Sequence, residues 1–315
     1  MHIVNTIAPV FLVVALGAML RRTGFVSADV QRGTNRLAYW VGLPCLLVVK
    51  ISDSGTVADK AGMMMLVFLA ATAGMIAVAL VAAKWMGMQA ARVGTFVQAS
   101  FRGNLAFIGL PVVFFAFSEG PGGGDAAQSV AALAIGPIVV IYNVVAVVAL
   151  LASEHRLGRT AFKKMGVGIA TNPLLIACLV GLLLVWLNAA TGATMPIFLQ
   201  RGLDVAGQFA LPLALLGVGG AVVATPLKGH LGPAVAAMLI KLSVGPALGL
   251  LFGWLLGADS YVTAIAMVML TCPTAVASYV LVEQLKGDPP LAAGSIVLST
   301  LGSAVAFSIV IATMT

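Results

Sequence analysis

Ten apolar stretches, each close to the length that crosses a lipid bilayer, follow one another along this chain of 315 residues. A spanning helix needs roughly 20 mostly apolar residues, because the hydrocarbon core of a bilayer is about 30 Å thick. The predicted spans are 4–20, 36–51, 61–84, 93–118, 128–152, 166–187, 204–224, 231–256, 260–284 and 290–313. These spans leave no room for a soluble domain, so the sequence predicts an all-α integral membrane protein.

The composition agrees with this fold class. Hydrophobic residues make up 61% of the chain and charged residues only 9%, whereas a typical soluble domain is about 25% charged. The net charge of +7 does not call for a nucleic-acid partner, because basic residues in short cytoplasmic loops account for it. The partner that this composition indicates is the lipid bilayer.

Basic residues gather in alternate connections between the predicted spans. Twelve lie in or beside the connections after spans 1, 3, 5, 7 and 9: Arg21, Arg22, Arg32, Arg36, Lys84, Arg92, Arg156, Arg159, Lys163, Lys164, Lys228 and Lys286. The other connections hold Lys50, Lys60 and Arg201. Because basic residues of short loops favour the cytoplasmic side, the first set is predicted to face the cytoplasm and both termini to lie outside.

The two halves of the chain share a proline pattern. Pro44 and Pro212 lie in similar Leu-Pro segments, 168 residues apart. The same shift carries Asn104 to position 272, beside Pro273. Agreement of the shift at separate places indicates an internal repeat.

Each half contains an odd number of spans, so the two halves enter the membrane from opposite sides. This is the pattern of an inverted-topology repeat. We therefore predict two five-helix repeats, residues 1–152 and 165–315, joined by a cytoplasmic linker at 153–164. In transporters of this architecture, equivalent helices, here the fourth and the ninth, are broken near the midplane and cross each other.

A polar stretch inside the fourth span, SFRGNLAFIGLP, carries the residues that a broken helix needs. Gly103 permits a non-helical turn, and the Asn104 side chain can cap the half-helix that follows. In the ninth span Pro273 fits the first turn of a helix, with Thr271 and Thr274 beside it as capping groups. Two half-helix N-termini that point into one pocket, each with roughly half a positive charge, suit a carboxylate.

The predicted substrate-binding residues are those of the two breaks together with one asparagine of the fifth span: Arg102, Gly103, Asn104, Asn143, Thr271, Cys272, Pro273 and Thr274. Asn143 either lines the pocket or bonds a neighbouring helix. Arg102 binds the substrate, satisfies the carbonyls that end the first half-helix, or does both. Lys241 lies deep in the eighth span, where a scaffold role and a coupling or charge role are both open.

The sequence offers no acid–base or metal site inside the spans. His2, His155 and His230 lie at ends or in loops, and no Asp or Glu lies mid-span. We therefore expect no metal site, no cofactor and no enzymatic activity, and a sodium–proton antiporter built on membrane carboxylates is disfavoured. The rival from another class is a non-transporting sensor or binding subunit for an organic acid, which would bind its ligand without moving it.

Seven stretches that together touch essentially all ten spans carry a family resemblance: APVFLVVALGAMLRRTGF, LAYWVGLPCLL, GNLAFIGLPVVF, IYNVVAVV, TNPLLIACLVGLLL, ALPLALLGVGGAVV and GDPPLAAGSIVLSTLGS. In these stretches the chain resembles bacterial members of the auxin efflux carrier family, within the bile acid/auxin superfamily. The resemblance implies secondary active transport of small organic anions, carboxylates such as malonate or malate, by alternating access at the crossing of helices 4 and 9. It also implies a moving panel of helices 1, 2, 6 and 7, a bacterial inner membrane location and a homodimer.

The resemblance leaves the coupling ion open, and a sodium-coupled symporter of bile-acid type is a further alternative. In the plant carriers a proline precedes the asparagine of the fourth-span crossover. Here Gly103 takes that place and Arg102 precedes it. A fixed guanidinium at this position favours a dicarboxylate over an aromatic monocarboxylate.

Overall fold

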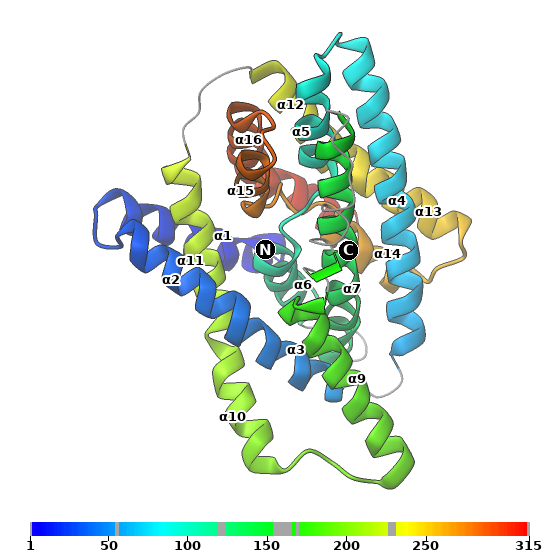
Figure 1. Cartoon of the computed structure of the whole chain (residues 1–315). Helices are drawn as coiled ribbons and strands as arrows, with labels where there is room; N and C mark the ends of the chain where they lie inside the picture. The colour runs from blue at the N-terminus through cyan, green and yellow to red at the C-terminus, as the bar shows by residue number, and fades with distance from the viewer. Residues whose placement is uncertain are drawn as a thin grey trace.

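The computed structural model describes residues 2–53, 57–118, 124–153, 166–167, 170–225 and 231–313. Within these residues every regular element is a helix, and the paired extended residues form an isolated β-bridge (Figure 1). The all-α prediction is therefore confirmed. Residues 154–164 of the predicted linker lie outside the described residues.

The first half of the chain builds its helices partly from consecutive segments. Across all the residues that the structure describes, three segments are π-helical turns, labelled η. The elements in order are α1 (His2–Arg22), α2 (Ala28–Leu37), η1 (Ala38–Gly42), α3 (Leu43–Ser52), α4 (Ala58–Trp85), α5 (Ala90–Phe101), η2 (Leu105–Gly109), α6 (Leu110–Ala116) and α7 (Gly124–Ser153).

The second half repeats this use of long, bent and broken helices. Its elements are α9 (Pro173–Thr191), α10 (Ile197–Gln208), α11 (Ala210–Ala224), α12 (Leu231–Leu239), η3 (Ile240–Val244), α13 (Gly245–Leu255), α14 (Ser260–Leu270), α15 (Ala277–Gln284) and α16 (Pro289–Ala312).

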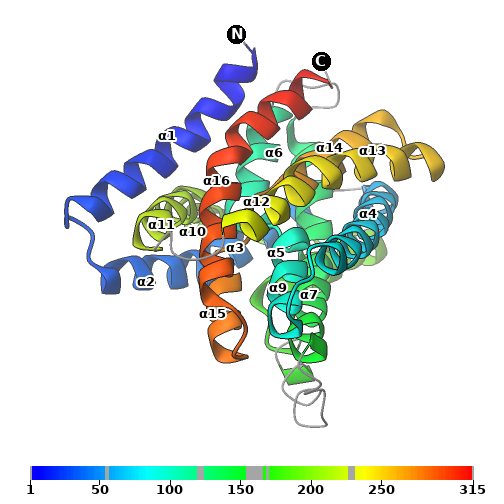
Figure 2. The same ribbon diagram turned by 90° about the horizontal axis from the view of Figure 1, so that it is seen from above.

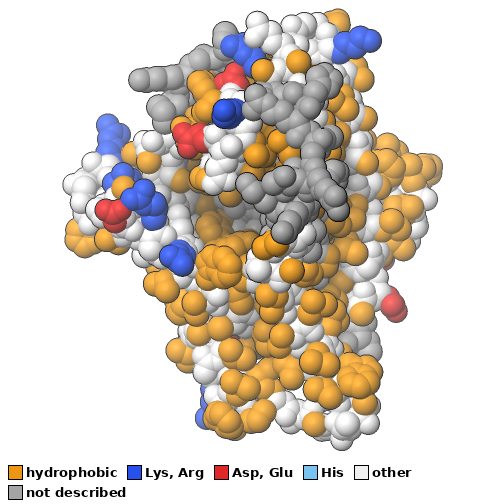
Figure 3. Space-filling model, in the orientation of Figure 1, with side chains coloured by type: hydrophobic (Ala, Val, Ile, Leu, Met, Phe, Trp, Pro, Cys, Tyr) orange, Lys and Arg blue, Asp and Glu red, His pale blue; other side chains and the backbone are white. Residues whose placement is uncertain are grey.

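Several helices have the length and apolar character of membrane spans. Six segments of the described chain meet both conditions: Ala58–Trp85, Ala126–Ser153, Pro173–Thr191, Ile197–Ala224, Leu231–Leu255 and Pro289–Ala312. On the face shown in Figure 3, hydrophobic side chains cover the lower part, and most visible Lys and Arg side chains lie in the upper part and on α2. This surface suits a multi-pass membrane protein, and the ten-span inverted topology stays a prediction.

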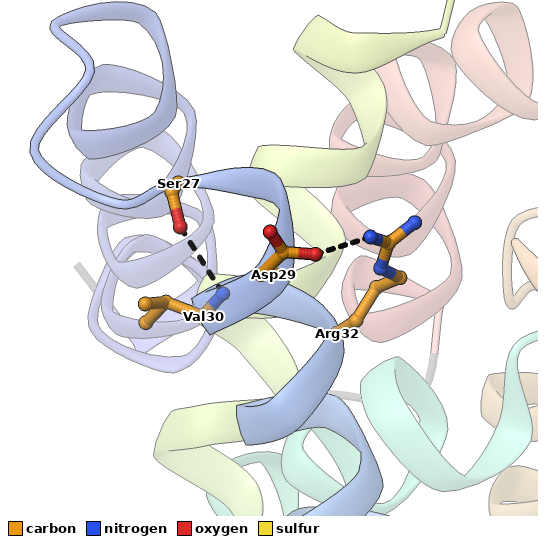
Figure 4. A network of polar contacts seen from close by, with 4 residues as sticks. All are labelled: Ser27, Asp29, Val30 and Arg32. Atoms are coloured by element: carbon orange, nitrogen blue, oxygen red, sulfur yellow. Dashed lines mark hydrogen bonds and ion pairs between the residues drawn. The ribbon is translucent and has the colours of Figure 1, made fainter.

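The helix that corresponds to the second predicted span begins earlier than predicted, in a polar segment. The Ser27 side chain caps α2 by accepting a hydrogen bond from Val30 N at 3.3 Å, and Asp29 pairs with Arg32 one turn further on (Figure 4). An N-cap serine satisfies an N–H group that the first turn leaves unpaired. The helix therefore begins at Ala28, about two turns before the predicted start, and its polar first turns become part of the bundle.

Each of these π-helical turns ends two residues before a proline. η1 precedes Pro44, η2 precedes Pro111 and η3 precedes Pro246. A proline lacks the N–H donor, and its ring crowds the carbonyl four residues earlier, which in each case lies inside the π turn. The residue before the proline bonds five residues back, as Leu43 N does to Ala38 O. The wider turn lets the helix continue through the proline.

Glycines bring α1 and α11 into close contact. A Cβ atom at Gly17 would lie 2.2 Å from Leu216 O, and one at Gly219 would lie 1.8 Å from Val14 O. No larger residue fits at either position unless the backbone moves. Figure 2 shows α1 next to α11. Because α2 also packs against α11, α1, α2 and α11 form one unit with α11 in common.

Gly219→Ala is expected to destabilise the protein by about 1–3 kcal/mol, because the added methyl group meets a backbone oxygen of α1. Thermal unfolding in detergent micelles measures the effect. Gly202→Ala in α10 is the control, since a Cβ atom there meets nothing within 4 Å, and alanine favours a helix by up to about 1 kcal/mol. Equal stability of the two variants would contradict the close α1–α11 contact.

Candidate functional site

The breaks in the fourth and ninth predicted spans lie against each other. The residues between α5 and η2 pair with those between α14 and α15 as a short antiparallel bridge. Asn104 N donates to Pro273 O at 2.8 Å, and Ala275 N donates to Arg102 O at 2.9 Å. Each break thus supplies hydrogen-bond partners for the backbone groups that the other break leaves open.

The Asn104 side chain does not cap the half-helix that follows, so this part of the prediction is wrong. No side-chain cap bond forms at Asn104. Its backbone carbonyl instead accepts hydrogen bonds from Ile108 N at 3.0 Å and Gly109 N at 3.2 Å. These bonds do not involve the amide side chain. Asn104 lies at the wall of a cavity and is 8% exposed.

Thr271 and Thr274 bond the ends of the first half-helices and not the starts of the second, which corrects their predicted capping role. Thr271 Oγ1 donates to Met267 O of α14 at 2.7 Å, and Thr274 Oγ1 donates to Ala99 O of α5 at 2.9 Å. The last carbonyls of a helix have no N–H partner within it. The Thr274 hydroxyl supplies a donor for Ala99 O, whereas Met267 O accepts from both the hydroxyl and the backbone N–H of Thr271.

A cavity of about 310 Å³ lies beside the two breaks. Its walls come from α2, η1, η2, α7, α9, α11, α15 and both breaks: Asn35, Tyr39, Arg102, Gly103, Asn104, Leu105, Ala106, Phe107, Val139, Tyr142, Asn143, Leu174, Gly217, Val218, Ala275, Val276, Ala277 and Val280. Most of these side chains are apolar, and the Tyr39 and Phe107 rings meet edge to face with centroids 6.4 Å apart. The polar groups of the lining are few and so define where a polar ligand group can bind.

The predicted binding residues divide between this cavity and the layer behind it. Those that line the cavity are Arg102, Gly103, Asn104 and Asn143. The first residues of both second half-helices, Leu105 and Ala277, line it too. The predicted residues outside the lining are Thr271, Cys272, Pro273 and Thr274. They belong to the bridge itself, where Thr274 N donates to Ser299 Oγ of α16 at 2.9 Å.

Arg102 brings a positive charge to the cavity wall. Its Nη2 donates to Asn143 Oδ1 at 2.6 Å, and its Nη1 lies 3.4 Å from Ser278 Oγ. The residue is 8% exposed, and no Asp or Glu of the described residues forms an ion pair with it. A largely buried charge without a countercharge is unfavourable, so an anion in this cavity would be stabilised. Asn143 both lines the cavity and orients Arg102.

Lys241 lies behind the bridge and not in the cavity lining. It is fully buried, and its Nζ donates to Leu270 O at 2.7 Å, at the end of α14. A Cβ atom at Gly103 would come within 3.2 Å of this Nζ, so the glycine leaves room for the ammonium group. A cation at a helix C-terminus is favourable. This contact supports the scaffold role, and the coupling role stays a prediction.

Three polar residues of the site were not expected from the sequence. Asn35 was missed because the second span was predicted to begin at residue 36, and the cap at Ser27 is the signal that could have extended it. Tyr39 lies inside that predicted span and was not singled out from its apolar neighbours. Ser278 was missed because a lone serine in an apolar segment looks like ordinary helix packing. Among the described residues, no group of His, Cys, Asp and Glu could hold a metal ion.

A family model described as "Membrane transport protein" matches residues 2–159 and, in a second match, residues 113–311. The two matches overlap and together cover nearly the whole chain. No curated protein matches it.

Thr274→Val is expected to destabilise the protein by about 1–3 kcal/mol, because it removes the hydroxyl donor to Ala99 O inside the protein. Thr271→Val should cost less, since Met267 O keeps the backbone bond from Thr271 N at 3.0 Å. Chemical or thermal unfolding in detergent compares the two isosteric changes. A larger loss for Thr271→Val would contradict this account of the bridge.

Proposed function

Because the chain belongs to the membrane transport protein family of the auxin efflux carrier type, we propose that it is a secondary transporter of small organic anions. Family membership and the apolar helices indicate a multi-pass membrane transporter. The anionic substrate, the alternating-access mechanism and a bacterial inner membrane location with both termini outside are our proposals. The observation that carries the anion is Arg102, a cation in the cavity wall without an acidic partner among the described residues.

The substrate class proposed is a small carboxylate, with dicarboxylates such as malonate or malate favoured. Arg102 offers several N–H donors in a planar fork, which matches a carboxylate. The starts of the η2–α6 and α15 half-helices also reach the cavity, and a helix N-terminus favours a negative charge. A cavity of about 310 Å³ suits a small ligand.

We propose that the described conformation opens toward the cytoplasm. The cavity is bordered by Asn35 of α2, which is next to Arg36 and one turn after Arg32 in that helix, and by α15, whose end leads to Lys286. All three basic residues belong to the set predicted to face the cytoplasm. Basic connections favour the cytoplasmic side. The close α1–α11 contact supports a panel that moves as a unit, with the two breaks on the opposing scaffold.

Arg102→Gln is expected to weaken binding of malonate more than binding of acetate, by about 1–3 kcal/mol for malonate, because a charge-assisted hydrogen bond is lost. Arg102→Lys should restore charge but not the planar, bidentate contact. Isothermal titration of the purified variants measures both affinities. Arg201→Gln, an exposed arginine of α10 outside the cavity, is the control. Equal losses for malonate and acetate would mean that Arg102 supports the backbone and does not read the substrate.

Uptake of labelled malonate into proteoliposomes is expected to continue when sodium is replaced by choline at constant pH. The reason is that no mid-span carboxylate is present in the sequence, and the cation found behind the bridge is Lys241. Loss of uptake in choline would favour the sodium-coupled alternative. Binding without any uptake in either salt would favour the sensor.

A further inference from the structure

The Asn35 side chain lies in the cavity lining with hydrogen-bonding capacity that the protein does not use. Asn35 belongs to α2 and rests on Gly217 of α11, where a Cβ atom would lie 1.7 Å from Asn35 Oδ1. This Oδ1 is buried, and no donor for it is found in the described part of the chain. An unpaired buried acceptor is unfavourable by about 1–3 kcal/mol, so the amide is not placed there to hold α2 and α11 together. Oδ1 is the amide atom nearest Gly217, whereas Nδ2 lies farther away, 3.0 Å from the same Cβ position. The donor end of the amide is therefore the end that can serve an anion, which accepts hydrogen bonds and cannot satisfy Oδ1.

The contact between these two helices is made by the residue one turn earlier. Gln31 lies on the same face of α2 as Asn35, because residues four apart are neighbours on a helix. Gln31 Nε2 donates to Gly217 O at 3.1 Å. Gln31 is not part of the cavity lining. The two amides of α2 thus differ: one bonds α11, and the other faces the cavity.

Asn35 and Arg102 belong to different walls of the cavity. Arg102 is held by Asn143 of α7 and lies next to Ser278 of α15, whereas Asn35 rests on α11. A ligand bound by Arg102 therefore has a second polar group within the same cavity, on the unit formed by α1, α2 and α11. An amide Nδ2 carries two donors, and a carboxylate oxygen accepts from them.

We propose that Asn35 is a substrate-binding residue that donates a hydrogen bond to the anion held by Arg102, so that the ligand joins the α1–α2–α11 unit to the broken helices. The inference rests on the proposed function. In this proposal Asn35 recognises the ligand, and Gln31 makes the contact between α2 and α11. Gly217 is then required to keep space for the amide at the cavity wall.

The test is a comparison of Asn35→Ala with Gln31→Ala, using malonate titration and thermal unfolding without ligand. Asn35→Ala should weaken malonate binding about tenfold, as expected for a hydrogen bond to a charged group, and leave the unfolding temperature unchanged or higher. Gln31→Ala should lower the unfolding temperature and leave the malonate affinity unchanged. Asn35→Asp, which keeps the shape but repels an anion, should lose more affinity than Asn35→Ala.

The outcomes separate this inference from the function on which it rests. If wild-type protein binds malonate and Asn35→Ala binds it equally well, the role of Asn35 is overturned and the transporter proposal stands. If Asn35→Ala lowers the unfolding temperature as Gln31→Ala does and keeps its affinity, Asn35 is structural. If wild-type protein binds none of malonate, malate and acetate, the proposed function fails and the role of Asn35 fails with it.

Discussion

A helix that is interrupted inside a membrane has no water to hydrogen-bond the backbone groups that it exposes. These groups must find partners in the protein, because each unpaired group is unfavourable by several kcal/mol in hydrocarbon. In this protein the two breaks meet that need jointly. Their backbones form hydrogen bonds with each other. Thr274 Oγ1 donates a hydrogen bond to the carbonyl of Ala99, and Lys241 Nζ donates one to the carbonyl of Leu270. Neither break is satisfied without the other, so the cavity beside them depends on this pairing.

The pairing also fixes the direction in which the arginine points. Arg102 is the residue that follows α5, and its carbonyl is held by Ala275 N. With the backbone anchored there, the side chain reaches Asn143 and borders the cavity, whereas Pro273 and Thr274 of the other break lie outside the cavity lining. The arrangement separates two positively charged side chains by one thin layer of backbone, with Arg102 on the cavity side and Lys241 on the other.

The sequence predicted the breaks better than the contacts around them. A glycine next to an asparagine, and a proline between polar residues, favour an interruption of a helix, and Gly103 and Pro273 located the breaks to within a few residues. Which end a hydroxyl satisfies depends on the neighbouring helix, and Thr274 bonds α5, far away in sequence. The cavity residue Asn35 escaped prediction because hydropathy marks where a span is apolar and not where its helix begins.

The permanent charge of Arg102 has a consequence for energetics across a polarised membrane. A guanidinium stays protonated in proteins, so a site of this kind is positive when empty, neutral with a monoanion and negative with a dianion. A charge that crosses a membrane potential of 100 mV changes its energy by about 2.3 kcal/mol. For a carrier of the proposed kind, the energy of reorientation in the membrane potential would therefore differ in sign or size between the empty and the loaded form. The membrane potential would then determine which of the two forms reorients more easily.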